Sequence, residues 1–413
     1  MYIVVALLSN ISNYYNYAIF GLAANFLVSH FITSADPLDG LSKFFATLFL
    51  AVLVKPFASI VFGTIGDRIG RSIAIKITSF TSIVAMLIII FAPSFQAIGY
   101  YATILLLISR ILVLTTVTAE GDGIRIYITE HLGQARINLA SSIVTSMGQI
   151  GVLLASLVIF FLHKMHVSLK VAFIIGAVLN LYVIYLRRFL IEPIEFSANR
   201  PHLPIAFDKI ISFVKNNWQL LLVAILINGC IGGIYSFYII FINSYASHIL
   251  LSNNTLLIPI SIICYVILSP VSGYLADQFG FFKQGLISIT LAMVLCAACI
   301  LQIVFLGKTF ATMLVIQAAI IPFYGVPMQI FLKNYLPIRL TYTIFSLCHS
   351  IGSILISTPT LFIVNYIWIL SNTLWINFCY IELLLLILII CILYIHKYRL
   401  HNISIITSGE NIN

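Results

Sequence analysis

The sequence predicts an all-α membrane protein with twelve transmembrane helices in two pseudo-symmetric bundles of six. Its 413 residues are 62% hydrophobic and only 8% charged, with a mean hydropathy of +1.12, whereas a soluble domain carries about 25% charged residues. A Gly-x-x-x-Asp-x-x-Gly pattern at 63–70 recurs at 273–280, each time between long apolar stretches. Such a repeat is typical of transporters with two related halves and a substrate site between them.

Twelve apolar stretches are long enough to cross a membrane, because about 20 helical residues span about 30 Å of hydrocarbon. No basic segment precedes the first stretch, so we expect it to remain as an uncleaved anchor. The helices are expected at residues 3–29, 42–64, 73–92, 99–118, 139–162, 169–186, 219–242, 255–276, 285–306, 310–332, 340–364 and 374–395.

Lysine and arginine residues set the predicted orientation. If the N-terminus is inside, fifteen of the 21 Lys and Arg residues fall on the cytoplasmic side and four fall on the outer side. Positive charge marks cytoplasmic loops, so both termini are expected in the cytoplasm. Because these residues are scattered over short loops, no nucleic-acid partner is expected.

The longest polar segment divides the chain into two halves. Residues 187–217 contain the charged and proline residues that separate the sixth apolar stretch from the seventh. We therefore predict a first bundle over 1–186, a cytoplasmic linker over 187–217, a second bundle over 218–395 and a short cytoplasmic tail over 396–413.

The repeated motif supplies most of a predicted cytoplasmic gate. Gly63 and Gly70 let the second and third helices approach closely, and Asp67 can face the positive N-terminal end of another helix. The alternative is that Asp67 and its basic neighbours only fix the topology. The predicted gate residues are Gly63, Asp67, Arg68, Gly70, Arg71, Glu120, Glu130 and Asp277.

Arg110 lies near the middle of the fourth predicted helix. A charge at the bilayer centre costs about 2.5–3.5 kcal/mol on the insertion scale, so we expect this side chain to face a cavity. The first half offers no carboxylate at that depth, and a guanidinium matches a carboxylate well. A substrate carboxylate is the functional interpretation, and a structural cation bonded to carbonyl, Asn or Tyr groups is the alternative.

The first helix carries a polar stripe, whose asparagines and tyrosines recur at three- and four-residue spacing and therefore share one face. Tyrosine rings can hold a quaternary ammonium by cation–π contact, although packing is the alternative role of each tyrosine. Combined with an arginine, the stripe favours a zwitterion such as proline or betaine over a dicarboxylate. The predicted substrate-binding residues are Arg110, Asn10, Asn13, Tyr14 and Tyr17, with Tyr235 and Tyr238 of the seventh helix as the opposing wall.

Several segments carry a family pattern: Gly63–Arg71, Ser9–Gly21, Lys55-Pro56, Arg110, Glu120, Tyr127, Glu130 and Arg187–Pro193. Through them the first half resembles the metabolite:proton symporters of the major facilitator superfamily, the group that contains proline/betaine and α-ketoglutarate carriers. The resemblance implies a bacterial inner-membrane transporter that works by alternating access. It also implies that the eleventh helix, which starts near Leu340, is the partner of Asp67.

The chain departs from that group in its first helix, where Asn13 and Asn16 replace two acidic residues. Because amides do not titrate, proton coupling needs another group at depth. His349 and Glu382 are the candidates, since histidine titrates near neutrality and a buried glutamate is readily neutralised. Either residue alone could instead form an ordinary interhelical hydrogen bond.

The sequence therefore predicts a secondary active transporter for a small zwitterionic or carboxylated metabolite of the osmolyte type. Its expected partners are this substrate, protons and the lipid bilayer; we expect a monomer, with no cofactor and no metal. The alternatives are an uncoupled facilitator and a non-transporting sensor or remnant. A membrane enzyme is not expected, because no His-Glu-x-x-His or Gly-x-Ser-x-Gly motif occurs.

Overall fold

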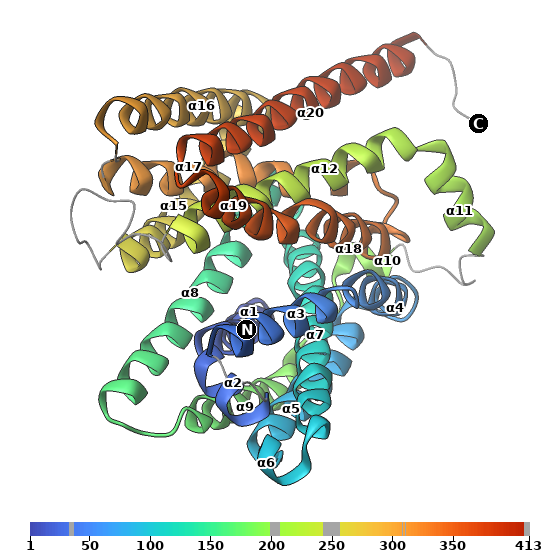
Figure 1. The fold of residues 1–413 in the computed structure, drawn as a ribbon. Helices are drawn as coiled ribbons and strands as arrows, with labels where there is room; N and C mark the ends of the chain where they lie inside the picture. Colours follow the sequence, from blue (N-terminus) through green and yellow to red (C-terminus); the bar gives the residue numbers. More distant parts are fainter. Residues whose placement is uncertain (33–36, 199–206, 243–256, 308, 310, 409–413) are drawn as a thin grey trace. The chain divides into compact units, whose positions relative to one another are not determined.

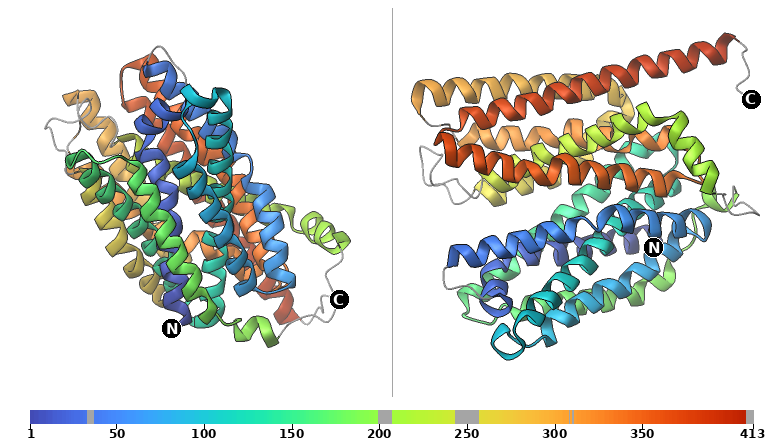
Figure 2. Two further views of the ribbon diagram at one scale, coloured as in Figure 1. Left: turned by 90° about the horizontal axis from the view of Figure 1, so that it is seen from below. Right: turned by 45° about the vertical axis from the view of Figure 1, so that its right-hand side comes forward.

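The computed structural model describes residues 1–413 except 33–36, 199–206, 243–256, 308, 310 and 409–413. The described chain consists of α-helices with short 3-10 and π-helical segments, joined by turns (Figures 1 and 2). It divides into two compact units. Unit 1 consists of Met1–Ala206 and Lys333–Ser350, and unit 2 consists of Phe207–Leu332 and Ile351–Asn413. Lys333–Ser350 thus groups with unit 1 although it comes from the second half of the sequence.

Unit 1 is built mainly from the helices of the first half of the chain. They are α1 (Tyr2–Leu22), α2 (Ala24–Phe31), α3 (Pro37–Val52), α4 (Lys55–Arg68), α5 (Arg71–Phe91), α6 (Phe95–Ile98), α7 (Tyr100–Leu132), η1 (Gln134–Arg136), α8 (Ile137–Lys164), α9 (Lys170–Leu186), η2 (Arg187–Phe189) and α10 (Ile194–Ala198). Most of α18 (Thr341–Gly352) also belongs to this unit.

Unit 2 contains the remaining helices. They are α11 (Phe207–Asn216), α12 (Trp218–Tyr235), the π-helical η3 (Ser236–Phe241), α15 (Leu257–Phe279), α16 (Phe281–Leu306), α17 (Ala311–Ile330), the π-helical η5 (Ser353–Ser357), α19 (Thr358–Ser371) and α20 (Trp375–Ser408). The 3-10 segment η4 (Phe331–Tyr335) lies at the boundary. α20 continues through most of the segment predicted as the tail.

Eleven helical segments in the described residues are long and apolar enough to cross a membrane. The first expected span is α1, which continues after a break at Ala23 as α2. It is not among the eleven, because its asparagines and tyrosines make it less apolar than the others. The all-helical membrane fold is confirmed. The eleven spans correspond to eleven of the twelve predicted helices, and the exact count of twelve stays a prediction.

Two predicted spans differ from the observed helices in an informative way. The stretch 42–64 is divided into α3 and α4, and Pro56 stands in the first turn of α4, where proline is tolerated because its missing N–H is not needed. The stretch 99–118 is only part of α7, a helix of 33 residues. The extra turns of α7 carry the carboxylates of the candidate site, Glu120, Asp122 and Glu130.

The core of unit 1 forms where α1, α5, α7, α8 and α9 pack against one another. Large side chains such as Tyr15, Phe20, Phe31 and Phe173 are fully buried there. A second apolar cluster, which includes Ile75 and Tyr127, lies beneath the start of the linker segment. These clusters fix α7 between α1 and α5, so that its polar groups meet those of both neighbours.

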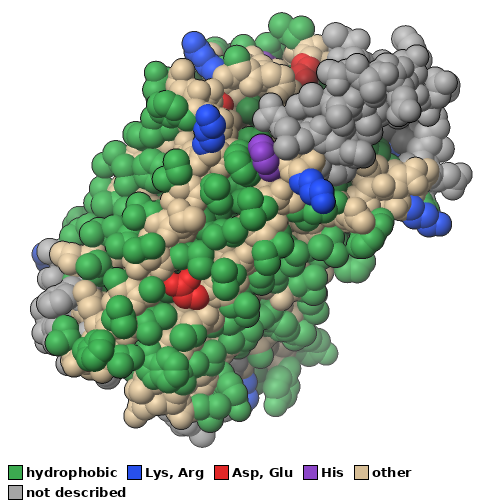
Figure 3. Space-filling model, turned by 90° about the horizontal axis from the view of Figure 1, so that it is seen from above, with side chains coloured by type: hydrophobic (Ala, Val, Ile, Leu, Met, Phe, Trp, Pro, Cys, Tyr) green, Lys and Arg blue, Asp and Glu red, His purple; other side chains and the backbone are tan. Residues whose placement is uncertain are grey.

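The surface of the molecule is apolar. Hydrophobic side chains cover most of the face shown in Figure 3, where charged side chains are few. Large side chains such as Phe57, Phe80 and Ile267 are 70%, 65% and 60% exposed. An exposed apolar surface of this extent is expected for helices that face lipid.

Candidate functional site

Helix α7 carries five buried charged side chains in unit 1: Arg110, Glu120, Asp122, Arg125 and Glu130. They follow one another along a single helix that rises 1.5 Å per residue, so they lie at different depths, and each contacts a different set of neighbours.

Arg110 is only 6% exposed. Its Nη1 donates a hydrogen bond of 3.1 Å to the carbonyl oxygen of Tyr17, and its guanidinium carbon lies 4.5 Å from the ring centre of Tyr17 and 5.3 Å from that of Phe20. Within the described residues its Nε has no hydrogen-bond partner and no ion pair involves it. The guanidinium therefore rests on aromatic rings with an N–H group still to be satisfied.

The polar stripe of α1 faces the interior of unit 1. Asn10 Nδ2 donates to the carbonyl oxygen of Val144 at 2.7 Å, and the ring of Tyr14 lies against Gly148 on the same helix, α8. Asn13 donates to the carboxylate of Glu120. The stripe is therefore shared between helix packing, at Asn10 and Tyr14, and the polar network on α7.

The two tyrosines predicted for the opposing wall lie in unit 2. The ring of Tyr235 meets that of Tyr265 edge to face at 5.6 Å. Tyr238 is 3% exposed and contacts the ring of Phe378. Both take part in aromatic packing within their own unit.

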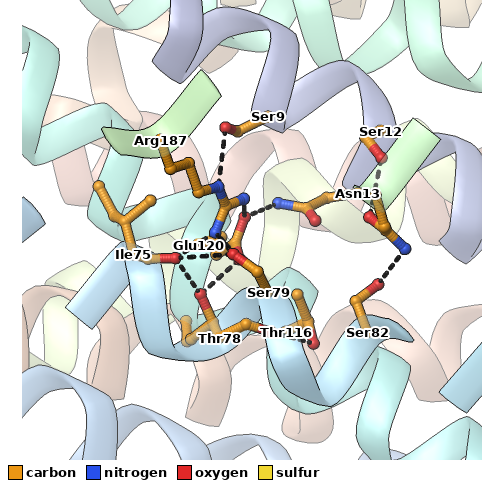
Figure 4. A network of polar contacts seen from close by, with 12 residues as sticks. Ser9, Ser12, Asn13, Ile75, Thr78, Ser79, Ser82, Thr116, Glu120 and Arg187 are labelled. Carbon is orange, nitrogen blue, oxygen red and sulfur yellow. Dashed lines mark hydrogen bonds and ion pairs between the residues drawn. The ribbon is translucent and has the colours of Figure 1, made fainter. Parts of the chain in front are cut away.

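Glu120 is the centre of a buried network that joins four helical elements (Figure 4). Its carboxylate receives Arg187 Nη1 at 2.8 Å and Nη2 at 2.6 Å, and it also accepts hydrogen bonds from Thr78 and Asn13. Glu120 is fully buried and Arg187 is 3% exposed. Paired and fully hydrogen-bonded charges are the form in which ions are tolerated in a protein interior.

Arg187 uses its remaining donors on the surrounding helices. Nε donates to Ser9 Oγ on α1 at 3.2 Å, and Nη1 also donates to the carbonyl oxygen of Ile75 and to Ser79 on α5. The first residue of the predicted linker is thus anchored inside the bundle. Glu120, predicted as a gate residue, belongs to this network.

Asp67 lies at the N-terminus of α18. It accepts hydrogen bonds from the backbone N–H groups of Tyr342 at 3.1 Å and Thr343 at 2.8 Å, and from the Thr343 hydroxyl at 2.7 Å. A carboxylate at this position satisfies free N–H groups and interacts favourably with the helix dipole. A side chain at Gly63 would collide with the backbone of Thr343, so glycine permits this close approach of α4 and α18.

Arg71 connects the same region to α7 and to the linker. It pairs with Asp67 at 3.1 Å and with Glu130 at 3.1 Å, and its Nη2 donates to the carbonyl oxygen of Ile338 at 2.7 Å. Glu192 accepts from the backbone N–H of Arg71 at 2.9 Å. These groups form one connected cluster at the end of unit 1.

The other predicted gate residues lie around or apart from this cluster. Gly70 separates α4 from α5 with a φ of 152°, and Arg68 is exposed. Asp277 lies near the end of α15 in unit 2. The second copy of the motif is therefore in a different unit from the first.

His349, one of the two coupling candidates, contacts a residue that the sequence reasoning missed. Its Nδ1 lies 2.8 Å and 3.0 Å from the two carboxylate oxygens of Asp122. Glu382, the other candidate, lies on α20 in unit 2, partly buried, and its Oε2 atom has no hydrogen-bond partner among the described residues.

Two residues of the site escaped prediction for identifiable reasons. Asp122 lies beyond the predicted end of the fourth span, and Arg187 was counted only as a cytoplasmic charge. A signal for Asp122 is present in its setting, Glu120-Gly-Asp122-Gly, because two carboxylates only two residues apart in an apolar helix point to different sides and both need partners.

Comparison with known proteins identifies the architecture. The family model described as Major Facilitator Superfamily matches residues 6–357. A citrate-proton symporter of Klebsiella pneumoniae is 24% identical over 360 residues, covering 83% of this chain and 80% of its own. A proline/betaine transporter of Salmonella typhimurium is 26% identical over 392 residues, covering 87% of this chain and 76% of its own.

Solved structures agree with that match. A proton:xylose symporter bound to 6-bromo-6-deoxy-D-glucose superposes with a TM-score of 0.71 at 13% identity, covering 96% of this chain and 94% of its own. A transporter named FucP, in an outward conformation, also gives 0.71 at 13% identity, covering 94% and 98%. These likenesses show the fold.

Proposed function

The chain belongs to the major facilitator superfamily and is a multi-pass membrane transporter, not an enzyme. We propose that it is a secondary active transporter for a small zwitterionic or carboxylated metabolite of the proline/betaine kind. Transport is coupled to protons and proceeds by alternating access. The bundles over 1–186 and 218–395, joined by the linker over 187–217, are the moving parts. The protein resides in a bacterial inner membrane as a monomer, with both termini in the cytoplasm.

The environment of Arg110 is the observation that supports this proposal. A buried guanidinium without a carboxylate partner is costly, and the Nε of Arg110 has no partner in the described chain. A substrate carboxylate would satisfy this N–H and neutralise the charge. The guanidinium lies against the rings of Tyr17 and Phe20, and its Nε–H is available to a substrate carboxylate.

The named relatives support the same class of substrate. One is called a citrate-proton symporter and another a proline/betaine transporter, and each of these substrates carries a carboxylate. Tyr14 and Tyr17, which lie on the same stripe of α1 as Asn10 and Asn13, are the aromatic groups proposed to hold the cationic end of a zwitterion. We therefore retain a zwitterion as the favoured substrate and a citrate-like anion as the competing one.

The cluster around Asp67 is the proposed cytoplasmic gate. The contact between Asp67 and the N-terminus of α18 joins the first half of the chain to the second half, and it is the kind of local, reversible bond that alternating access requires. His349 and Glu382 are the proposed proton-coupling groups, because Asn13 and Asn16 cannot titrate.

Uptake into proteoliposomes tests the proposal. Labelled proline, betaine and citrate are offered with and without an imposed proton gradient, to the wild type, Arg110→Ala and Arg110→Lys. We expect gradient-driven uptake of one substrate, no uptake by Arg110→Ala, and weak uptake by Arg110→Lys, because a lysine keeps the charge but not the bidentate geometry.

A matched control is Arg188→Ala, which removes an exposed arginine and should leave uptake unchanged. Normal transport by Arg110→Ala would refute the substrate-anchor role. Uptake without any dependence on the proton gradient would identify a facilitator, and binding without uptake would identify a sensor.

A further inference from the structure

Asp122 and His349 form an ion-pair geometry inside unit 1. The imidazole Nδ1 contacts both carboxylate oxygens, at 2.8 Å and 3.0 Å. Asp122 is 2% exposed as a residue, whereas the His349 side chain is 36% exposed. One member of the pair is therefore shielded and the other is open on one side, which is the arrangement that a proton needs to enter and leave.

The backbone of α7 and α18 brings the pair together. Tyr342 and His349 are seven residues apart and share one face of α18. The Tyr342 hydroxyl donates to the carbonyl oxygen of Ala119 and lies directly over Gly123, where any side chain would collide with it. Glycine at position 123 thus lets α18 lie against α7, and this close packing places His349 at Asp122.

The same face of α18 is held by neutral hydrogen bonds. The Ser346 hydroxyl donates to Ser59 Oγ on α4 at 3.0 Å, and Ser59 Oγ donates to the Ser346 carbonyl oxygen at 3.1 Å. Together with Asp67 at the N-terminus, these contacts hold the segment Thr341–Ser350 in unit 1. His349 is the titratable side chain closest to the end of that segment, where the chain leaves the unit after Ser350.

Titratable and charged groups of neighbouring helices surround the pair. Tyr14 on α1, Lys55 on α4 and Tyr342 on α18 interact electrostatically with Asp122, and Arg125 on α7 interacts with Tyr14. Glu120 and Asp67 interact with Tyr342. In contrast to the Tyr, Lys, Arg, Asp and Glu side chains around it, a histidine side chain has an unperturbed pKa between about 5 and 8.

We propose that the Asp122–His349 pair carries the coupled proton and that its protonation holds α18 in the closed cytoplasmic gate. This inference rests on the proposed function and deepens it, since it adds Asp122 as a residue of the coupling machinery. In the closed gate the proton resides on the imidazole, and the imidazolium donates a charge-assisted hydrogen bond to the ionised Asp122. Such bonds are about twice as strong as neutral ones.

Loss of the proton weakens the gate. The imidazolium gives its proton to water, the imidazole becomes neutral, and the negative charge of Asp122 is left without a cationic partner on α18. The hold on Thr341–Ser350 is then reduced to hydrogen bonds, which include the weaker bond from the neutral imidazole, and to the Asp67 contact. Loss of the proton and release of α18 are therefore thermodynamically linked.

The segment that follows the pair is suited to such a movement. After α18 ends at Gly352, the helix changes to the π-helical η5 over Ser353–Ser357. Single π-helical turns are frequent at functional sites and where helices bend. The change in helix type lies at the boundary between the released segment and unit 2.

Hydrogen–deuterium exchange of the full protein in lipid nanodiscs tests this inference without any substrate. The exchange of the peptide over Thr341–Ser350 is followed between about pH 6 and pH 8, corrected for the intrinsic exchange rate. In the wild type we expect protection to fall about five-fold across this range, because the imidazolium–carboxylate ion pair is exchanged for a weaker hydrogen bond from a neutral imidazole. Asp122→Asn and His349→Gln should each abolish this pH dependence.

Ser346→Ala is the matched control, because it removes a neutral hydrogen bond from the same face of α18. It should raise exchange equally at every pH and retain the wild-type pH dependence. If Asp122→Asn and His349→Gln both keep the full pH dependence, the inference is wrong. Agreement of the two variants also guards against a folding defect of either one.

The uptake assay separates this inference from the proposed function. A protein that transports none of the offered substrates, but whose pH-dependent protection disappears in both variants, would contradict the proposed function and support the pair as a proton-controlled gate. Proton-coupled uptake that persists in Asp122→Asn, together with unchanged exchange, would contradict the pair and leave the proposed function standing.

Discussion

Removal of either member of the Glu120–Arg187 pair should strongly destabilise unit 1. Both side chains are at most 3% exposed, and they are joined by contacts of 2.8 Å and 2.6 Å. Glu120→Ala would leave the Arg187 guanidinium buried without its counter-charge, and deleting one partner of a buried ion pair costs about 3–5 kcal/mol. Arg187→Met should cost a similar amount, because the carboxylate is then stranded and Ser9 and Ser79 lose their donor.

The double variant measures the interaction between Glu120 and Arg187 separately from the effect of losing either side chain. With Glu120→Leu and Arg187→Met combined, no buried charge remains unpaired, and such replacements are often neutral or stabilising. We expect its stability to lie above that of either single variant. The non-additivity should be near the upper end of the range of about 0.5–3 kcal/mol seen for residues in contact.

The measurement is the apparent Tm of the purified protein in detergent, with Arg188→Ala as the control. Arg188 is the neighbouring arginine in the sequence, yet it is exposed and stacks on the ring of Tyr185 at 3.9 Å. Its removal should change stability by no more than about 0.5 kcal/mol. If Glu120→Ala were as stable as Arg188→Ala, or if the two single effects simply added, the network of Figure 4 would not be the stabilising element described here.

Further predictions concern the gate and the second coupling candidate. Asp67→Asn should weaken the contact with Tyr342 and Thr343 and raise the labelling of engineered cysteines from the cytoplasmic side; unchanged labelling would make Asp67 a bystander. Gly63→Val should reduce uptake sharply, since a side chain at Gly63 collides with the Thr343 backbone, and normal uptake would show that α4 and α18 need no close contact. Glu382→Gln should leave the proton dependence of uptake intact if the Asp122–His349 pair carries the proton, and its loss would return the coupling role to α20.

The membrane fold was predictable because lipid-spanning helices must be apolar over the thickness of the hydrocarbon core, and hydropathy measures that property directly. Apolar stretches of about 20 residues correspond to the observed spans. The glycines of the motif at 63–70 were expected to bring the second and third helices together, but Gly63 faces Thr343 of α18 and Gly70 faces Glu192. The break between α3 and α4 was less visible, although Pro56 offered a reason for it. The helix ends were missed where polar residues continue a helix inside the protein, as in α7, which ends at Leu132 and not near residue 118.

The polar site was only partly predictable, because sequence patterns cannot distinguish a charge in water from a charge buried among protein groups. Arg110 could be predicted as a buried cation, because it lies near the middle of an apolar stretch and far from any loop that would place it in water. Arg187 follows directly after an apolar helix, where positive residues usually mark the cytoplasmic surface. Nothing in its sequence position shows that its side chain turns inward to meet Glu120, because that contact depends on how α1, α5 and α7 pack.

The difference between charges that are paired inside the protein and charges that are open to solvent also separates the two carboxylates Glu120 and Asp122. The substitution of Asn13 and Asn16 for acidic residues removes charge from α1, and Asn13 now donates to Glu120 within a network whose charges are already balanced by Arg187. Asp122 differs from Glu120 in that its partner is a histidine with an open side, on the one segment of the second half that packs within unit 1. We therefore propose that Asp122 on α7 and His349 on α18 take the proton-coupling role that the acidic residues of the first helix have in the related group.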